Sequence, residues 1–259
     1  MIYNRFIVCG DSYSEGMSDE MVGDQYRGWA DRVADEMAKH SDSFTYANLA
    51  IRGKLVGQVV ADQVPQALTF VTGKDTLISF HAGANDALRP GYDAAKTIAL
   101  YKETVRTIAA SGASVLLFTV LEDTGNTGKG AEVWKSRFYE FNKAVREVGA
   151  EVGATVSDAN GLDFFSDNRF LAFDRLHLNE DGHWRVCQAV LEILGYPFNA
   201  AWRIPLPPAI PESWIKQRIT GVRWFFSFAL PWVWRRIRGV SSGDGRTAKY
   251  PQPISWPRV

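Results

Sequence analysis

Asp174 and His177 lie three residues apart, directly before a segment of helical period that Asn179 is placed to cap. At this spacing in a turn, the carboxylate can hold one imidazole nitrogen while the other nitrogen faces a nucleophile. The pair therefore makes His177 a candidate general base and Asp174 a candidate orienting carboxylate.

Ser12, in the sequence Gly10–Asp11–Ser12, is the candidate nucleophile. It follows a short apolar run and is bracketed by Gly10 and Gly16, so the backbone can turn sharply and leave the hydroxyl exposed. The same residues could also form a simple Asx or Ser turn at the end of a strand. Both interpretations stay open when this segment is taken alone.

Two other segments carry groups that could donate hydrogen bonds to a ligand. Gly53 opens a helical segment and could present its amide, although a glycine that merely starts a helix is the simpler interpretation. Asn85, in Gly83–Asp86, could donate its side-chain amide to a developing oxyanion or could cap a helix. Neither residue indicates a function by itself.

The elements that position these residues alternate along the first 200 residues. Short β-branched and aromatic runs predict strands at Arg5–Gly10, Phe44–Ala50, Asp75–Gly83, Ser114–Val120 and Ala154–Ser157. Apolar residues at helical spacing predict helices at Trp29–Lys39, Lys54–Val64, Ala94–Ala110, Val133–Glu151 and Asn179–Leu194. This order predicts a parallel sheet with helices on both faces, and ligands in such folds bind where the carboxyl ends of the strands meet the following loops.

The four loop segments fall in chain order at that predicted edge, and together they resemble the SGNH hydrolases, also called GDSL-type esterases and lipases. The blocks of that family match Gly10–Asp11–Ser12, Gly53, Gly83–Asp86 and Asp174–His177, and the resemblance spans about residues 5 to 195. One position departs from the pattern, because Tyr13 stands where the family has Leu or Ile.

The resemblance implies a three-layer α/β/α, flavodoxin-like fold with a five-stranded parallel sheet. It implies a carboxylic ester hydrolase for a small-molecule ester, with Ser12, His177 and Asp174 as the catalytic triad. The Ser12 amide, the Gly53 amide and the Asn85 side chain would form the oxyanion hole. The reaction needs no cofactor. An acyltransferase, or a lipid- or carbohydrate-binding protein on the same fold, remains an alternative.

Composition limits the other classes of protein. With 46% hydrophobic and 22% charged residues, the chain of 259 residues is neither disordered nor a coiled coil. Four scattered histidines and two cysteines, Cys9 and Cys187, show no zinc-binding spacing, so we expect no metal site and two buried thiols. No signal-peptide pattern or transmembrane segment is predicted, which favours a cytoplasmic protein.

Residues 125–130 contain three glycines and predict a loop over the site.

The last part of the chain differs in composition from the rest. Residues 201–259 hold 10 Lys and Arg against 2 Asp and Glu, whereas residues 1–200 hold 19 against 27. We therefore divide the chain into an esterase domain, residues 1–197, and a Pro-rich spacer with a basic aromatic extension, residues 198–259. Residues 201–238 could pack on the acidic body, join two subunits or contact a membrane surface. Nucleic-acid binding is disfavoured, and the composition of residues 241–259 is typical of a loop or a disordered segment.

Overall fold

One mixed sheet forms the centre of the computed structural model, which describes residues 1–123, 129–162, 167–211 and 213–257. Its strand order is β7-β6-β5-β1-β4-β8. All neighbours are parallel except β8, which is antiparallel to β4. The strands are β1 (Arg5–Gly10), β4 (Thr45–Asn48), β5 (Thr76–His81), β6 (Ser114–Phe118), β7 (Thr155–Ser157) and β8 (Tyr250–Ser255). A separate hairpin consists of β2 (Met21–Val22) and β3 (Gln25–Tyr26).

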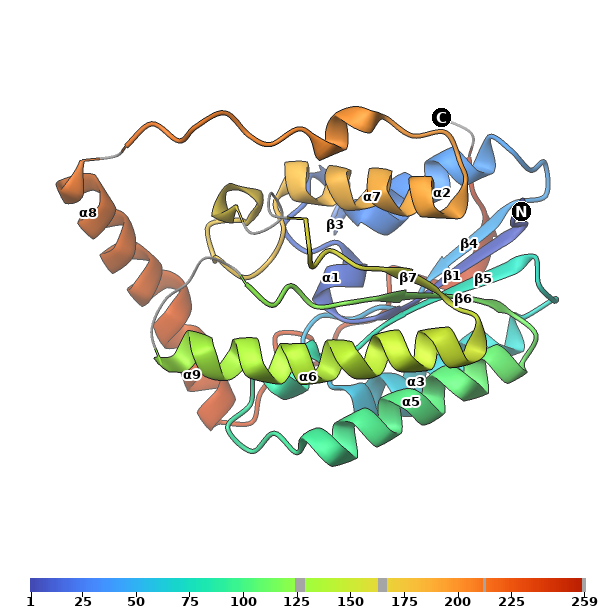
Figure 1. The fold of residues 1–259 in the computed structure, drawn as a ribbon, viewed down its shortest axis with the longest axis horizontal. Coiled ribbons are helices and arrows are strands. Elements are labelled where there is room, and N and C mark those ends of the chain that lie inside the picture. The colour runs from blue at the N-terminus through green and yellow to red at the C-terminus, as the bar shows by residue number, and fades with distance from the viewer. Residues whose placement is uncertain (124–128, 163–166, 212, 258–259) are drawn as a thin grey trace.

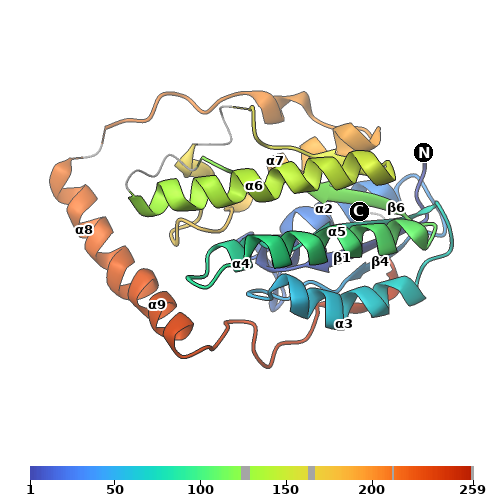
Figure 2. The ribbon, with the colours of Figure 1, turned by 60° about the horizontal axis from the view of Figure 1, so that its bottom comes forward.

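Helices cover both faces of the sheet (Figure 1, Figure 2). On one face α2 (Gly28–Ala38) packs against α7 (Glu180–Leu194). On the other face α5 (Ala94–Ala110) lies between α3 (Val56–Thr69) and α6 (Lys129–Val152). The result is three layers, as predicted.

The central strand β1 shows why these strands are continuously apolar. Its side chains alternate between the two faces of the sheet. Phe6 and Val8 belong to the core with α2 and α7, whereas Ile7 and Cys9 belong to the core with α3, α5 and α6. All four side chains are fully buried. A parallel sheet covered on both faces has no solvent side, so polar residues are absent from the middle of this strand.

The predicted elements of the body are present, with shifted boundaries. Asn179 caps α7 as predicted, because its side chain accepts a hydrogen bond from the Gly182 amide. Helix α6 begins at Lys129 rather than at Val133. The loop predicted for residues 125–130 therefore ends in the first turn of that helix, and its remaining residues, 125–128, lie outside the described residues.

The sequence predicts a loop or a disordered segment for residues 241–259, and for Tyr250–Ser255 this prediction is wrong. These residues form β8, which pairs with β4 at the edge of the sheet. Pro251 and Pro253 argue against a strand in the sequence, because proline has no N–H group to donate to a neighbouring strand. An edge strand tolerates proline, since one side of it has no neighbour. The predicted division at residues 197 and 198 stays a prediction, and β8 adds part of the extension to the sheet of the body.

A buried ion pair anchors this returning segment. The Lys249 ammonium lies 2.7 Å from the Asp31 carboxylate, with both side chains almost completely buried. It also donates to the backbone carbonyls of Tyr26 and Arg27, at 3.0 and 2.8 Å. Because each charge has a partner and hydrogen bonds, the pair holds the extension against α2 at a defined position.

Between α7 and β8 the chain leaves the layers. An extended stretch leads to α8 (Trp214–Trp224), which continues through a π-helical turn, η4 (Phe225–Ala229), into α9 (Leu230–Ile237). Figure 1 shows this long helix at the end of the molecule toward which the parallel strands run. Within the described residues, no helix is long and apolar enough to cross a membrane.

Candidate functional site

Ser12 is the first residue of the short helix α1 (Ser12–Glu15), which Asp11 separates from the end of β1. The chain turns here at close range to the neighbouring strand. A Cβ atom on Gly10 would lie 2.6 Å from the His81 carbonyl oxygen and 2.7 Å from Ser14 Oγ, so only glycine fits. Gly10 thereby brings the Ser12 hydroxyl to the carboxyl edge of the sheet, where the fold predicts a ligand.

His177 reaches Ser12 from a turn 165 residues later in the chain. Its Nε2 atom lies 3.0 Å from Ser12 Oγ, and its Nδ1 atom lies 2.6 Å from Asp174 Oδ2. The other carboxylate oxygen, Asp174 Oδ1, accepts the backbone N–H groups of Leu176 and His177. Serine, imidazole and carboxylate thus form one continuous hydrogen-bonded chain, with the carboxylate fixed by its own turn.

The electrostatic balance at Asp174 favours its charged form. Burial acts to raise the pKa of this carboxyl, but the hydrogen bond and charge of the His177 imidazole, with two backbone N–H groups, outweigh that effect. The pKa of Asp174 therefore lies below its ordinary value, and the group is an anion at neutral pH. An anion beside Nδ1 favours the tautomer of a neutral imidazole that carries its proton on Nδ1, so that Nε2 is the acceptor in the hydrogen bond with the Ser12 hydroxyl.

Gly53 lies in a loop that a side-chain pair ties to α1. The backbone N–H of Arg52 donates to the Glu15 carboxylate at 2.6 Å, and the Arg52 guanidinium donates to both oxygens of the same group. Glu15 belongs to the same helical turn as Ser12. Gly53 itself has a φ of +74°, a left-handed conformation that favours glycine. The pair therefore fixes the Gly53 loop relative to the serine.

Asn85 is also at the site, but its side chain is engaged. Its Nδ2 atom donates to Asp11 Oδ2 at 3.0 Å and to the Lys54 carbonyl at 3.1 Å. Both partners are pure acceptors, so they identify this atom as the amide nitrogen. Asn85 thus connects the serine turn to the Gly53 loop, and both of its hydrogens already have an acceptor.

Two backbone amides at the site differ from Asn85 in this respect. Ser12 begins a helix, where the first N–H groups have no intrahelical partner. Across the described part of the chain, neither the Ser12 amide nor the Gly53 amide has a hydrogen-bond acceptor. Both amides are therefore available to an oxygen atom of a bound ligand.

Sequence analysis did not reveal a contact between the long C-terminal helix and the turn of Asp174. The Trp224 indole N–H donates to the Asp174 carbonyl at 2.9 Å. The Arg175 guanidinium stacks over the Trp224 ring at 4.8 Å, and the Arg223 guanidinium lies 5.3 Å from the centre of the Phe173 ring. The Trp- and Arg-rich composition of the extension signalled such contacts, but no pattern in the sequence indicated where they would be made.

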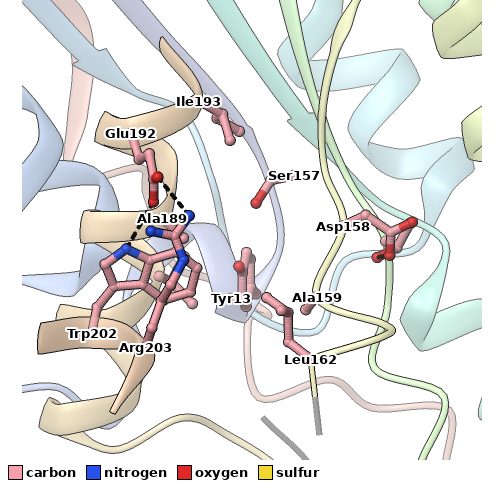
Figure 3. Close-up of a pocket in the computed structure, with 12 residues that line it drawn as sticks. Tyr13, Ser157, Asp158, Ala159, Leu162, Ala189, Glu192, Ile193, Trp202 and Arg203 are labelled. Atoms are coloured by element: carbon pink, nitrogen blue, oxygen red, sulfur yellow. Dashed lines mark hydrogen bonds and ion pairs between the residues drawn. The ribbon is translucent and has the colours of Figure 1, made fainter. Parts of the chain in front are cut away.

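A small cavity opens near the site on the α7 side of the sheet (Figure 3). Its volume is about 190 Å³, and Tyr13, the residue after Ser12, forms part of its wall. On the opposite wall Glu192 accepts hydrogen bonds from Trp202 and Arg203. Ser12 and His177 do not line this cavity. Tyr13 is the only lining residue that belongs to α1, so the cavity is distinct from the contact between Ser12 and His177.

His183, which the sequence places in a packed helix, has a structural role. Its Nδ1 atom accepts the Trp29 backbone N–H at 3.3 Å, and its Nε2–H donates to the Met17 carbonyl at 3.1 Å. Only the neutral tautomer satisfies both contacts, because protonated Nδ1 would face a donor. Burial lowers the pKa of His183 from its ordinary value of 6.5 to about 4.

The lowered pKa of His183 predicts an acid-dependent loss of stability. Between about pH 6.5 and pH 4 the unfolded chain binds a proton at this residue and the folded chain does not, so stability falls as the pH falls. The resulting loss in the free energy of unfolding reaches up to about 3 kcal/mol. Urea unfolding of the wild type and His183→Gln at pH 7 and pH 4.5 measures it. We expect a smaller acid-induced loss in the variant, and equal losses in both proteins would contradict the assignment.

Comparisons with known proteins agree with this fold. Residues 8–185 match the model of the GDSL-like lipase/acylhydrolase family. The psychrotrophic esterase EstA from Pseudoalteromonas sp. is 19% identical with a TM-score of 0.55, and the match covers 74% of this chain and 97% of that one. The acetylxylan esterase Axe2 from Geobacillus stearothermophilus is 16% identical with a TM-score of 0.59, and the match covers 76% of this chain and 97% of Axe2. TesA is 19% identical with a TM-score of 0.57, and the match covers 73% of this chain and 97% of TesA.

No curated protein matches the chain in sequence. At identities this low, the solved structures show that the fold is shared. The family model matches the sequence itself over residues 8–185, which is more than half of the chain. The chain therefore belongs to the GDSL-like lipase/acylhydrolase family and is a carboxylic ester hydrolase.

Proposed function

We propose that this hydrolase acts through an acyl-enzyme intermediate on Ser12, with His177 as general base and Asp174 as the group that orients it. The observation that carries the proposal is the unbroken contact from Ser12 Oγ to His177 Nε2 and from His177 Nδ1 to Asp174 Oδ2, at 3.0 and 2.6 Å. A serine hydroxyl is a weak nucleophile, and a base at hydrogen-bond distance removes its proton as it attacks.

In the first half of the reaction, Ser12 Oγ attacks the ester carbonyl carbon and His177 Nε2 takes the serine proton. The tetrahedral intermediate then collapses, the C–O bond to the alcohol breaks, and the leaving oxygen takes the proton from Nε2. In the second half, water attacks the acyl-serine, gives a proton to Nε2, and that proton returns to Ser12 Oγ. Acid, alcohol and free enzyme are the products.

The negative charge of each tetrahedral intermediate develops on the former carbonyl oxygen. We propose that the Ser12 and Gly53 amides donate to this oxygen, since neither has an acceptor among the described residues. Asn85 would be the third donor, after one of its N–H groups turns from Asp11 or from the Lys54 carbonyl. Removing one such donor typically lowers kcat by about 10²–10³.

Covalent labelling tests the assignment of the nucleophile. A p-nitrophenyl alkylphosphonate ester is attacked at phosphorus by an activated serine, and p-nitrophenolate leaves. We expect the mass of the protein to rise by one phosphonyl group, located by peptide mass spectrometry on Ser12. Labelling on another serine, or no labelling, would remove Ser12 from the mechanism.

Ser14→Ala is the matched control for this experiment. Ser14 belongs to the same helical turn as Ser12, but it is buried and its Oγ has no hydrogen-bond partner within the described structure. We expect Ser14→Ala to be labelled like the wild type and Ser12→Ala to remain unlabelled.

A further inference from the structure

The long C-terminal helix, α8–η4–α9 or residues 214–237, contacts the body along one side only. Figure 1 and Figure 2 both show it standing outside the three layers, and in Figure 1 it lies at the end of the molecule toward which the parallel strands run. Most of its half-buried side chains recur at about one-turn spacing, at Thr220, Trp224, Phe228, Trp232 and Arg235, and Ala229 and Pro231 are also half-buried. Within this row, Trp224 is fixed by its hydrogen bond to the Asp174 carbonyl.

A second row of residues on this helix is apolar and exposed. We call it the apolar stripe; it consists of Ile215, Ile219, Val222, Phe226, Leu230 and Val233. These residues are three or four positions apart, so they follow one side of the helix. Each has between 45% and 64% of its surface exposed in the complete chain. No described residue covers the stripe, so folding of the chain onto itself leaves it open to solvent.

The charge around the stripe has a single sign. Residues 213–243 contain no Asp or Glu and six Lys or Arg, three near the start of the helix and three near its end. Trp214 and Trp234 are also exposed, at 70% and 57%. Indole rings and long basic side chains favour the boundary between lipid headgroups and acyl chains, where an apolar body and a polar tip are both solvated.

We propose that the apolar stripe inserts into the surface of a bilayer that contains anionic lipid, with the helix parallel to the membrane plane. The stripe would replace water with acyl chains, and the basic residues would contact lipid phosphates. The charge of the rest of the molecule supports this orientation, because residues 1–200 carry a net negative charge that an anionic surface repels. The helix would therefore face the lipid and the layered body would face away.

This orientation would bring the candidate site near the lipid surface. Phe173 and Leu176, which flank Asp174 and His177 in the same turn, are exposed at 49% and 39%. Trp224, Arg175 and Arg223 join that turn to the helix. Membrane binding itself does not depend on the proposed reaction, so the two proposals can be tested separately.

Co-sedimentation of the full chain with sucrose-loaded vesicles tests the proposal. We expect the wild type to bind vesicles of phosphatidylcholine and phosphatidylglycerol, and to bind vesicles of pure phosphatidylcholine much more weakly. The double variant Ile219→Asp/Phe226→Asp places two charges in the stripe and should lower the partition coefficient for the anionic vesicles by at least about tenfold. Circular dichroism checks that the variant keeps its helix content.

Two controls separate this result from non-specific effects. Ile2→Asp adds a charge at a residue that is 58% exposed and next to the N-terminus, which Figure 1 marks at the side of the molecule opposite α8, so it should bind like the wild type. Ser12→Ala should also bind like the wild type, because the stripe does not involve the candidate nucleophile. A wild type that binds the anionic vesicles but is not labelled on Ser12 would then overturn the proposed function alone.

Two outcomes would overturn the membrane proposal. The first is a wild type that binds neither kind of vesicle, and the second is equal binding by the wild type and the folded double variant. If the first outcome comes with a dimer in analytical ultracentrifugation that the double variant abolishes, the stripe is assigned to contact between two copies of the chain.

Discussion

Ser12→Ala is expected to lower kcat/KM for a short p-nitrophenyl ester by at least about 10⁴. The substitution removes the only oxygen that His177 Nε2 contacts at 3.0 Å in the described structure, so no acyl-enzyme can form. The backbone amides of Ser12 and Gly53 remain, and with them a small residual rate through direct attack by water. Release of p-nitrophenolate under saturating and limiting substrate gives kcat and KM separately. We expect the loss in kcat.

The control for this prediction is again Ser14→Ala, which we expect to retain the activity of the wild type within a few-fold. Thermal unfolding of both variants checks that the fold is intact. Equal rates for Ser12→Ala and the wild type would show that another group carries the reaction.

Asp174→Asn is expected to lower kcat by about 10⁴, by reversing the tautomer of His177. The amide oxygen of Asn can still accept the backbone N–H groups of Leu176 and His177, so the turn keeps its shape. The Asn amide nitrogen would face His177 Nδ1, 2.6 Å from the present carboxylate oxygen, and would donate to it. The imidazole proton then moves to Nε2, which can no longer accept the proton of Ser12.

Asp167→Asn provides the matched control, because Asp167 is a nearby carboxylate that caps a 3₁₀ turn and pairs with Arg169, away from His177. We expect it to have nearly normal kcat. The double variant Ser12→Ala/Asp174→Asn should be no slower than Ser12→Ala, since the two residues act in one unit. An additive loss in the double variant would contradict the proposed roles.

The sheet and helices of the body could be predicted from short stretches of sequence, because strands that are buried on both faces consist of uninterrupted apolar runs. Phe6 to Cys9 are apolar without interruption since each faces a helical layer, and the parallel topology follows from strands that alternate with helices. The family resemblance rests on short segments for a similar reason. Gly10 is required by the close approach of His81, and Asp174 and His177 lie within one turn, so local spacing alone carries the signal.

The contacts of Asn85 were beyond sequence analysis. Its residue type made it a candidate donor to an oxyanion, but its hydrogens point to Asp11 and to the Lys54 carbonyl. These acceptors come from two other loops, and only their positions in space determine which of them the amide reaches.

The strand β8 is the other feature that local patterns concealed. Pro251 and Pro253 reduce the strand signal, and the pairing with β4 crosses more than 200 residues of chain. The partner of Lys249, the Asp31 carboxylate, is equally remote in sequence. Such contacts depend on the path of the whole chain, which no short window records.

The amino-acid sequence by itself determined the layered sheet and pointed to the candidate serine, histidine and aspartate, because the spacing of apolar residues and the residues of a tight turn are local properties. Tertiary structure alone decided that Trp224 bonds to the turn of Asp174, that β8 closes the edge of the sheet, and that one side of the C-terminal helix stays open. These outcomes depend on packing between segments far apart in the chain, where the same Trp- and Arg-rich composition is compatible with several partners until the fold selects one.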